Sequence, residues 1–377
     1  MKIAVNARFL LPGKLEGIGW YTYEVVRRMA EAHPEDEFWL LFDRPVKEGF
    51  RFGPNVRMMT LSPPARHPFL WLAWFEGRIP ATLRRLGADV FFSPDNYCSL
   101  RSSTPTLLVM HDIAYAHFPA HIPWLSRQYY RFFVPRFLRR AERVLTVSEF
   151  TKQDLIRTLG VPGDKIRVAG NGPREVFRPL PEDEKREIRT RFSGGEPYFL
   201  YVGAIHPRKN VPRLIRAFDL FKERTNAPHR LLLAGRWGWQ TGEVKTAFEQ
   251  ARHQTAIHFM GYVDDDLLAG LMGAAFALTY VSLWEGFGLP VLEALFSEVP
   301  VIYGNATSLP EVAGDAGLAV DPESEESIAG GMAALVLDEG MAKQLVEKGR
   351  LQRQKFSWDH TARVVYEELK SLARRAQ

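Results

Sequence analysis

Two patterns of apolar residues alternate along the chain. Short runs rich in β-branched and aromatic residues have the length of buried strands, and the segments between them show the spacing of amphipathic helices. The predicted strands cover residues 2–5, 38–42, 90–93, 106–111, 143–147, 198–202, 230–234, 257–259, 275–280 and 299–303. The helical patterns include residues 21–32, 211–224 and 327–337. This alternation predicts an α/β protein built on parallel sheets.

A segment with a different composition divides the strands into two series. Residues 175–196 contain two prolines, a run of charged residues and two adjacent glycines, which is typical of a domain linker. A chain of 377 residues is also too long for one typical core. We therefore expect two doubly wound domains, residues 1–174 and 195–355, with a ligand cleft at the carboxyl ends of their strands. Residues 356–377 contain a last helix, with Ser357 as a candidate N-cap.

The composition excludes several classes of protein. A hydrophobic content of 46% is typical of a globular chain, and the longest apolar run, residues 69–75, is far shorter than the ~20 residues of a membrane span. The first residues lack the pattern of a signal peptide, and the single cysteine, Cys98, excludes an internal disulfide. We expect a cytoplasmic protein. The formal net charge of +5 slightly favours anionic ligands, and no nucleic-acid-binding motif is present.

The strongest chemical signal is residues 285–293, Glu-Gly-Phe-Gly-Leu-Pro-Val-Leu-Glu. They follow a predicted strand, and Pro290 suits the first turn of a new helix. The glycines let the backbone of Phe287, Gly288 and Leu289 approach a ligand, and the helix start offers N–H groups to a diphosphate. Glu285 and Glu293 can each accept hydrogen bonds from a pair of hydroxyls. One of the two pairs would belong to a sugar and the other to a ribose. The alternative interpretations are that Glu285 is a solvated charge in a loop and that Glu293 only interacts favourably with the helix dipole.

A basic turn lies between the strand 198–202 and the helix at Val211. Its residues Arg208 and Lys209 precede a helix N-terminus, where two cations can neutralise a diphosphate and stabilise it as a leaving group. A solvated basic turn is the alternative. The run Asp264-Asp265-Asp266 resembles a metal-binding carboxylate cluster, but it precedes a helical pattern. Helix capping explains that run better, so we predict no catalytic metal.

Two features fall in the N-terminal half. His111 ends a predicted strand, where a lone histidine is usually structural. Gly17 and Gly19 lie in a predicted loop, residues 16–19, between the first strand and helix. That loop resembles a dinucleotide fingerprint, with Asp43 where a ribose-binding acid would stand. However, Thr22 stands in place of the third glycine, so a nicotinamide-dependent oxidoreductase is a weak alternative.

Six segments resemble, in order, the motifs of the retaining "group 1" glycosyltransferases (glycosyltransferase family 4), which have the GT-B fold. The Glu-x7-Glu motif is the most specific of these. The segments are residues 17–22, 111–115, 147–151, 171–172, 202–210 and 285–293.

The resemblance implies how the residues are used. The donor, a nucleotide-diphosphate sugar, lies mainly on the C-terminal domain and the acceptor mainly on the N-terminal one, onto which the last helix crosses back. His111 contacts the donor near the reacting anomeric carbon. Gly17 and Gly19 let the N-terminal domain reach the diphosphate, and the backbone at Val263 contacts the base. Many members have an arginine where this chain has Ala204, so Arg208 is implied to supply that charge.

The same resemblance implies transfer with retention of configuration and no cofactor beyond the donor itself. The mannosyltransferase-like forms of residues 111–112 and 207–210 favour GDP-mannose as donor and a glycan or lipid-linked acceptor. A sugar-nucleotide epimerase of the same fold and a non-catalytic sugar-nucleotide-binding protein remain alternatives.

Aromatic residues and arginines are interleaved in two segments of the N-terminal half. Residues 68–75 are flanked by four arginines, and residues 124–140 contain five. Such segments either form a core with solvated arginines or bind an anionic membrane surface. The second possibility predicts a peripheral protein on the inner face of the membrane.

Overall fold

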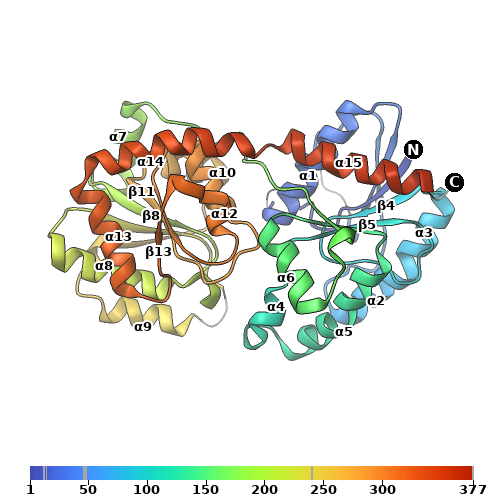
Figure 1. The fold of residues 1–377 in the computed structure, drawn as a ribbon, viewed down its shortest axis with the longest axis horizontal. Helices are drawn as coiled ribbons and strands as arrows, with labels where there is room; N and C mark the ends of the chain where they lie inside the picture. Colours follow the sequence, from blue (N-terminus) through green and yellow to red (C-terminus); the bar gives the residue numbers. More distant parts are fainter. Residues whose placement is uncertain (12, 14, 46–48, 239–240, 376–377) are drawn as a thin grey trace. The chain divides into compact units, whose positions relative to one another are not determined.

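The computed structural model describes residues 1–11, 13, 15–45, 49–238 and 241–375. Its described residues form two compact units (Figure 1). The first contains residues 1–171 together with 357–377, and the second contains residues 172–356.

The first unit is built on a seven-stranded parallel sheet with the order β3-β2-β1-β4-β5-β6-β7. Its central strands are buried on both faces, which is why they read as continuous apolar runs. The strands are β1 (Lys2–Asn6), β2 (Glu37–Phe42), β3 (Val56–Thr60), β4 (Val90–Ser93), β5 (Thr106–Met110), β6 (Arg143–Thr146) and β7 (Ile166–Val168).

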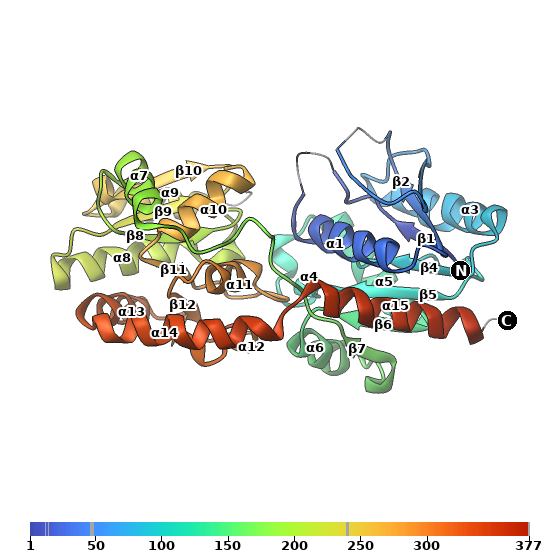
Figure 2. The ribbon, with the colours of Figure 1, turned by 90° about the horizontal axis from the view of Figure 1, so that it is seen from above.

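Helices cover this sheet, and the last helix of the chain is one of them. The helix α15 (Trp358–Arg375) runs beside α1 (Gly17–Ala32), as Figures 1 and 2 show. Arg28 on α1 donates to Asp359 on α15 at 2.7 Å, and Ser357 accepts the backbone N–H of Asp359 at the start of α15. The other α-helices in the described part of this unit are α2 (Pro68–Ala73), α3 (Ile79–Leu86), α4 (Ala114–His117), α5 (Trp124–Arg140) and α6 (Glu149–Leu159).

The second unit has a six-stranded parallel sheet with the order β10-β9-β8-β11-β12-β13. Its strands are β8 (Tyr198–Val202), β9 (Arg230–Ala234), β10 (Ile257–Gly261), β11 (Ala277–Tyr280), β12 (Val301–Gly304) and β13 (Gly317–Val320). Its α-helices, among the residues described, are α7 (Glu182–Ser193), α8 (Val211–Thr225), α9 (Gly242–Gln250), α10 (Asp265–Ala274), α11 (Leu289–Phe296), α12 (Leu309–Ala313), α13 (Glu325–Leu337) and α14 (Glu339–Gln352). The prediction of an α/β protein with parallel sheets is confirmed.

All ten predicted strands are present among the described residues, which also form three strands that were not predicted. These three, β3, β7 and β13, are edge strands of the two sheets. An exposed arginine interrupts the apolar run in β3 and in β7, and β13, although apolar, begins with glycine and is only partly buried.

Two sequence predictions differ from the structure. Residues 182–193, placed in the linker, form the helix α7, which packs against α10 within the second unit. Arg189 on α7 donates to the carbonyl of Ala274 at 2.8 Å. The predicted loop at residues 16–19 is also wrong, because Gly17 begins α1 and Gly19 lies in its first turn.

Candidate functional site

The strand order of the second unit reverses between β8 and β11. The chain continues from β8 to β9 on one side of this pair and from β11 to β12 on the other side. Such a switch point leaves a crevice at the carboxyl ends of the strands. The segment after β8 contains Arg208 and Lys209, and the segment after β11 contains Glu285. The two segments are joined by a hydrogen bond from the backbone N–H of Leu283 to the carbonyl of Arg208 at 2.9 Å.

Glu285 is the centre of a buried polar cluster at this point. Its carboxylate accepts hydrogen bonds from the ammonium of Lys209 and, at 2.8 Å, from the hydroxyl of Tyr280. The Lys209 ammonium also donates to the Tyr280 oxygen at 2.7 Å, and the Arg208 guanidinium lies 3.5 Å from the second carboxylate oxygen. Since Glu285 is only 7% exposed, it is not the solvated loop charge of the alternative interpretation.

The electrostatics of the cluster favour an ionised Glu285. Burial alone would raise the pKa of this carboxyl, but Lys209 and Arg208 outweigh burial and lower its pKa to about 2. The pKa of Tyr280 is raised well above its usual value by burial and by the neighbouring negative charge. The cluster therefore presents one fixed carboxylate with two cations in the physiological pH range.

The surrounding backbone holds the Glu285 segment in place. The side chain of Ser308 donates to the carbonyls of Glu285 and Phe287, at 3.0 and 2.8 Å, and the hydroxyl of Thr307 accepts the N–H of Glu285 at 3.1 Å. Asn210 has left-handed backbone geometry, and its amide donates to the carbonyl of Val281 at 3.0 Å. These contacts preorganise the segment before any ligand binds.

The helix α11 begins at Leu289, as the sequence predicted, with Pro290 in its first turn. Gly288 precedes it with a φ of 103°, and a Cβ at this position would lie 2.6 Å from a methyl group of Leu309. Both constraints require glycine here. The first turn of a helix has N–H groups without intrahelical acceptors, so this helix start can bind an anion.

Glu293 lies in the second turn of α11 and is 1% exposed. Its carboxylate accepts a hydrogen bond at 2.7 Å from Nε of Arg174, whose Nη1 also pairs with Asp265 on α10. Arg174 was not among the predicted site residues. No pattern marked it, because it lies outside every predicted strand and helix.

The aspartate run 264–266 caps a helix. The side chain of Asp264 accepts the backbone N–H of Leu267 at 2.9 Å, and Asp265 and Asp266 lie in the first turn of α10. The predicted capping role is confirmed. Val263 lies between β10 and α10, beside the exposed ring of Tyr262.

In the first unit, His111 directly follows β5 and is partly exposed. Its Nε2 lies 2.7 Å from the carbonyl of Pro94, and its backbone N–H donates to the side chain of Asn96 at 2.7 Å. Burial lowers the pKa of the His111 imidazole, which favours the neutral ring at neutral pH. Thr151, in the first turn of α6, donates to the His111 carbonyl at 3.2 Å.

Gly19 has a structural reason to be glycine. A Cβ at this position would lie 2.7 Å from the carbonyl oxygen of Phe9 and 2.8 Å from a methyl group of Leu15. Gly17 is the first residue of α1. Because these glycines lie in a helix rather than in a loop, the segment loses its likeness to a dinucleotide-binding turn.

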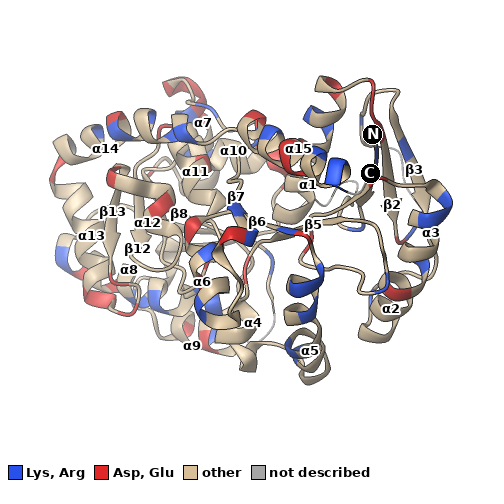
Figure 3. Ribbon diagram, turned by 45° about the vertical axis from the view of Figure 1, so that its right-hand side comes forward, with Lys and Arg blue, Asp and Glu red and all other residues tan. Residues whose placement is uncertain are grey.

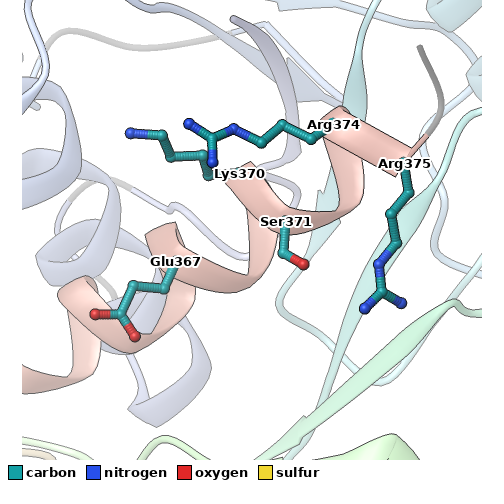
Figure 4. A pocket seen from close by; sticks show the side chains of 5 residues that line it. All are labelled: Glu367, Lys370, Ser371, Arg374 and Arg375. Atoms are coloured by element: carbon teal, nitrogen blue, oxygen red, sulfur yellow. The ribbon is translucent and has the colours of Figure 1, made fainter.

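A concave surface in the first unit lies along the last turns of α15, where it is lined by Glu367, Lys370, Ser371, Arg374 and Arg375 (Figure 4). The ring of Tyr21 contacts both His111 and Trp358, which places His111 near the start of α15. At 1.5 Å per residue, the concave surface is roughly 13–25 Å further along the helix. It is therefore separate from the strand ends that hold His111.

Three of the predicted site residues, Arg208, Lys209 and Glu285, contact one another. Leu289 and Glu293 belong to the helix α11 that follows Glu285, and Gly288 directly precedes it. Tyr280 was not among the predicted site residues, although its place at the end of β11, five residues before Glu285, was a usable signal. Among the described residues, no helix has the length and apolarity needed to cross a membrane.

Comparison with known families gives two adjoining matches. Residues 15–173 match the family described as "Glycosyltransferase Family 4", and residues 182–352 match "Glycosyl transferases group 1". Together the matches cover most of both units.

Two curated relatives are mannosyltransferases by name. O-antigen chain mannosyltransferase B of Escherichia coli is 30% identical over 364 residues, covering 92% of this chain and 93% of the relative. O-antigen chain mannosyltransferase RfbU of Salmonella typhimurium is 26% identical, covering 73% and 72%. Among solved structures, sucrose-phosphate synthase from Thermosynechococcus elongatus has a TM-score of 0.82 at 20% identity and covers 98% of both chains. This likeness establishes the GT-B fold.

Proposed function

Because the chain belongs to glycosyltransferase family 4 and is a glycosyltransferase, we propose that it transfers mannose from GDP-mannose to a glycan or lipid-linked acceptor. The donor binds the second unit and the acceptor binds the first. Transfer retains the anomeric configuration and requires no metal ion.

The observation that carries this proposal is the cluster of Glu285 with Lys209 and Arg208 beside the start of α11. Two cations and a helix N-terminus suit a diphosphate, and the carboxylate between them suits the hydroxyls of a hexose. Lys209 and Arg208 stabilise the negative charge that develops on the leaving diphosphate. The diphosphate in turn helps to deprotonate the acceptor hydroxyl, so both reactants stay on one face of the sugar.

The choice of mannose rests on the relatives. Both O-antigen enzymes are mannosyltransferases by name, and the first is similar over nearly its whole length. The epimerase, oxidoreductase and non-catalytic alternatives have no comparable support.

The test is a transfer assay with GDP-mannose, UDP-glucose and UDP-galactose, each in the presence and absence of EDTA. We expect product only with GDP-mannose, an α-linked product by NMR because the donor is the α-anomer, and equal rates with and without EDTA. A strict requirement for Mg²⁺ or Mn²⁺ would contradict the role assigned to Arg208 and Lys209. An inverted product would contradict the same-face mechanism.

We also propose that the first unit contacts an anionic membrane surface. The large side chains of Phe69 on α2 and of Trp124 and Phe132 on α5 are 66%, 66% and 51% exposed, whereas Trp74 and Tyr129 from the same segments are buried. Each segment thus contributes some aromatic side chains to the core and leaves others exposed, where they can contact a membrane.

Arginines accompany the exposed aromatics, and Figure 3 shows basic residues along α3 and α5. Arg131 and Arg139 on α5 are exposed, as are Arg84 and Arg85 on α3. Exposed aromatic side chains with nearby arginines suit an interface rich in anionic lipid.

Sedimentation with vesicles checks this proposal. Each well-placed arginine contributes about 1 kcal/mol near an anionic surface, so we expect binding to anionic vesicles that is lost at high salt. The variant Arg131→Gln/Arg139→Gln should bind at least tenfold more weakly, whereas the control Arg252→Gln in the second unit should bind normally. Equal pelleting with neutral and anionic vesicles, or none with either at low salt, would contradict membrane contact.

A further inference from the structure

The two carboxylates of the 285–293 motif have different cationic partners. Glu285 contacts Lys209 and Arg208, both from the segment after β8. Glu293 contacts Arg174, which comes from the segment that precedes α7. Both carboxylates are buried, but only the first obtains its cations from the predicted diphosphate-binding turn.

Arg174 is itself firmly held. Its guanidinium is shared between Glu293 and Asp265, lies 4.7 Å from the ring centre of Phe177, and is largely buried. Contacts through two different nitrogens fix its orientation. The contact with Glu293 occupies the oxygen Oε1, at 2.7 Å.

A buried carboxylate needs a countercharge to stay ionised. The charged groups that face Glu293 are Arg174, from the segment before α7, and Asp265, from α10. Burial raises the pKa of Glu293, Arg174 opposes this rise, and Asp265 adds to it. Loss of the arginine would therefore favour the protonated acid, which accepts hydrogen bonds less well than a carboxylate does.

We propose that Arg174 is a positioning residue for the donor: it holds Glu293 as an oriented carboxylate that accepts the two hydroxyls of the ribose in a nucleoside diphosphate. This inference rests on the proposed function, since it requires a nucleotide at Glu293. It adds a residue outside the motif and predicts that donor affinity depends on pH through Glu293.

The sign of the pH effect follows from the chemistry. Donor binding uses the ionised form, so affinity falls as the pH drops through the pKa of Glu293. Removing the positive charge of Arg174 raises that pKa, so the loss of affinity moves to higher pH. We expect an upward shift of about one pH unit or more, which is typical for the loss of a close opposite charge.

The experiment is calorimetric titration of the full chain with GDP, and with UDP in parallel, at intervals from about pH 5 to about pH 8.5. Arg174→Met and Arg174→Gln should both bind the nucleotide about tenfold more weakly at neutral pH. As the pH is lowered, their affinity should begin to fall at a higher pH than that of the wild type. Arg174→Lys, which keeps the charge, should stay within about threefold of the wild type. Glu293→Gln should bind weakly with a flat pH profile.

Arg178→Met is the matched control, because Arg178 lies on the same segment but is exposed and pairs with Glu184. It should bind like the wild type. The inference would be overturned by an unshifted pH profile in Arg174→Met and Arg174→Gln. It would also be overturned if Arg174→Lys lost as much nucleotide affinity as those two variants. Failure of the wild type to bind either nucleotide would instead contradict the proposed function.

Discussion

Glu285→Gln should lower kcat by about 10²- to 10³-fold while changing the KM for the donor less than about threefold. The Glu285 carboxylate is buried, ionised and held by three side chains, so it can orient the hydroxyls of the donor sugar at the reacting carbon. Glutamine keeps the shape but removes the charge and one acceptor. Steady-state kinetics with GDP-mannose check this expectation.

Glu293→Gln is the matched comparison, because the second carboxylate is assigned to the ribose rather than to the sugar. It should raise the donor KM about tenfold and leave kcat nearly unchanged. Since the pKa of Glu285 is about 2, its ionisation is complete above about pH 5, and the loss in Glu285→Gln should be independent of pH from there upward. Wild-type kinetics from the double variant would contradict both assignments.

The central strands of both sheets were predictable because burial on both faces produces continuous apolar runs. The rule that such strands pair in parallel also predicts that the segments after β8 and β11 meet, which places Lys209 near Glu285. The start of α11 was predictable for a local reason, since Pro290 and the preceding glycine specify it.

Other parts could not be predicted from local patterns. The helix α7 is polar over most of its length, and it forms through contact with α10, so its sequence resembles a linker. Arg174 contacts residues 91 and 119 positions away along the chain, and only the folded unit brings them together. The first turn of α1 contains two glycines, which oppose helix formation, and Gly19 is required there by the nearby Phe9 carbonyl.

Lys209→Met should lower kcat/KM for the donor by about 10³-fold. Lys209 is the cation in closest contact with Glu285, and it is assigned both to the diphosphate and to the orientation of that carboxylate. Its loss removes charge stabilisation from the leaving group and leaves Glu285 with Arg208 as its remaining cation.

Two control variants separate this effect from unfolding. Lys209→Arg keeps the positive charge and should retain more activity than Lys209→Met. Lys209→Met/Glu285→Gln removes both charges of the pair and should recover thermal stability without recovering activity. A stable, fully active Lys209→Met would contradict the assignment.

The most direct measurement is calorimetric titration of GDP-mannose into the wild type and into Lys209→Met, with EDTA present throughout. The account predicts one donor molecule bound per wild-type chain and at least a hundredfold weaker binding by the variant. Absence of binding to the wild type, or equal affinity in the two proteins, would contradict a donor site built on Lys209, Glu285 and the start of α11.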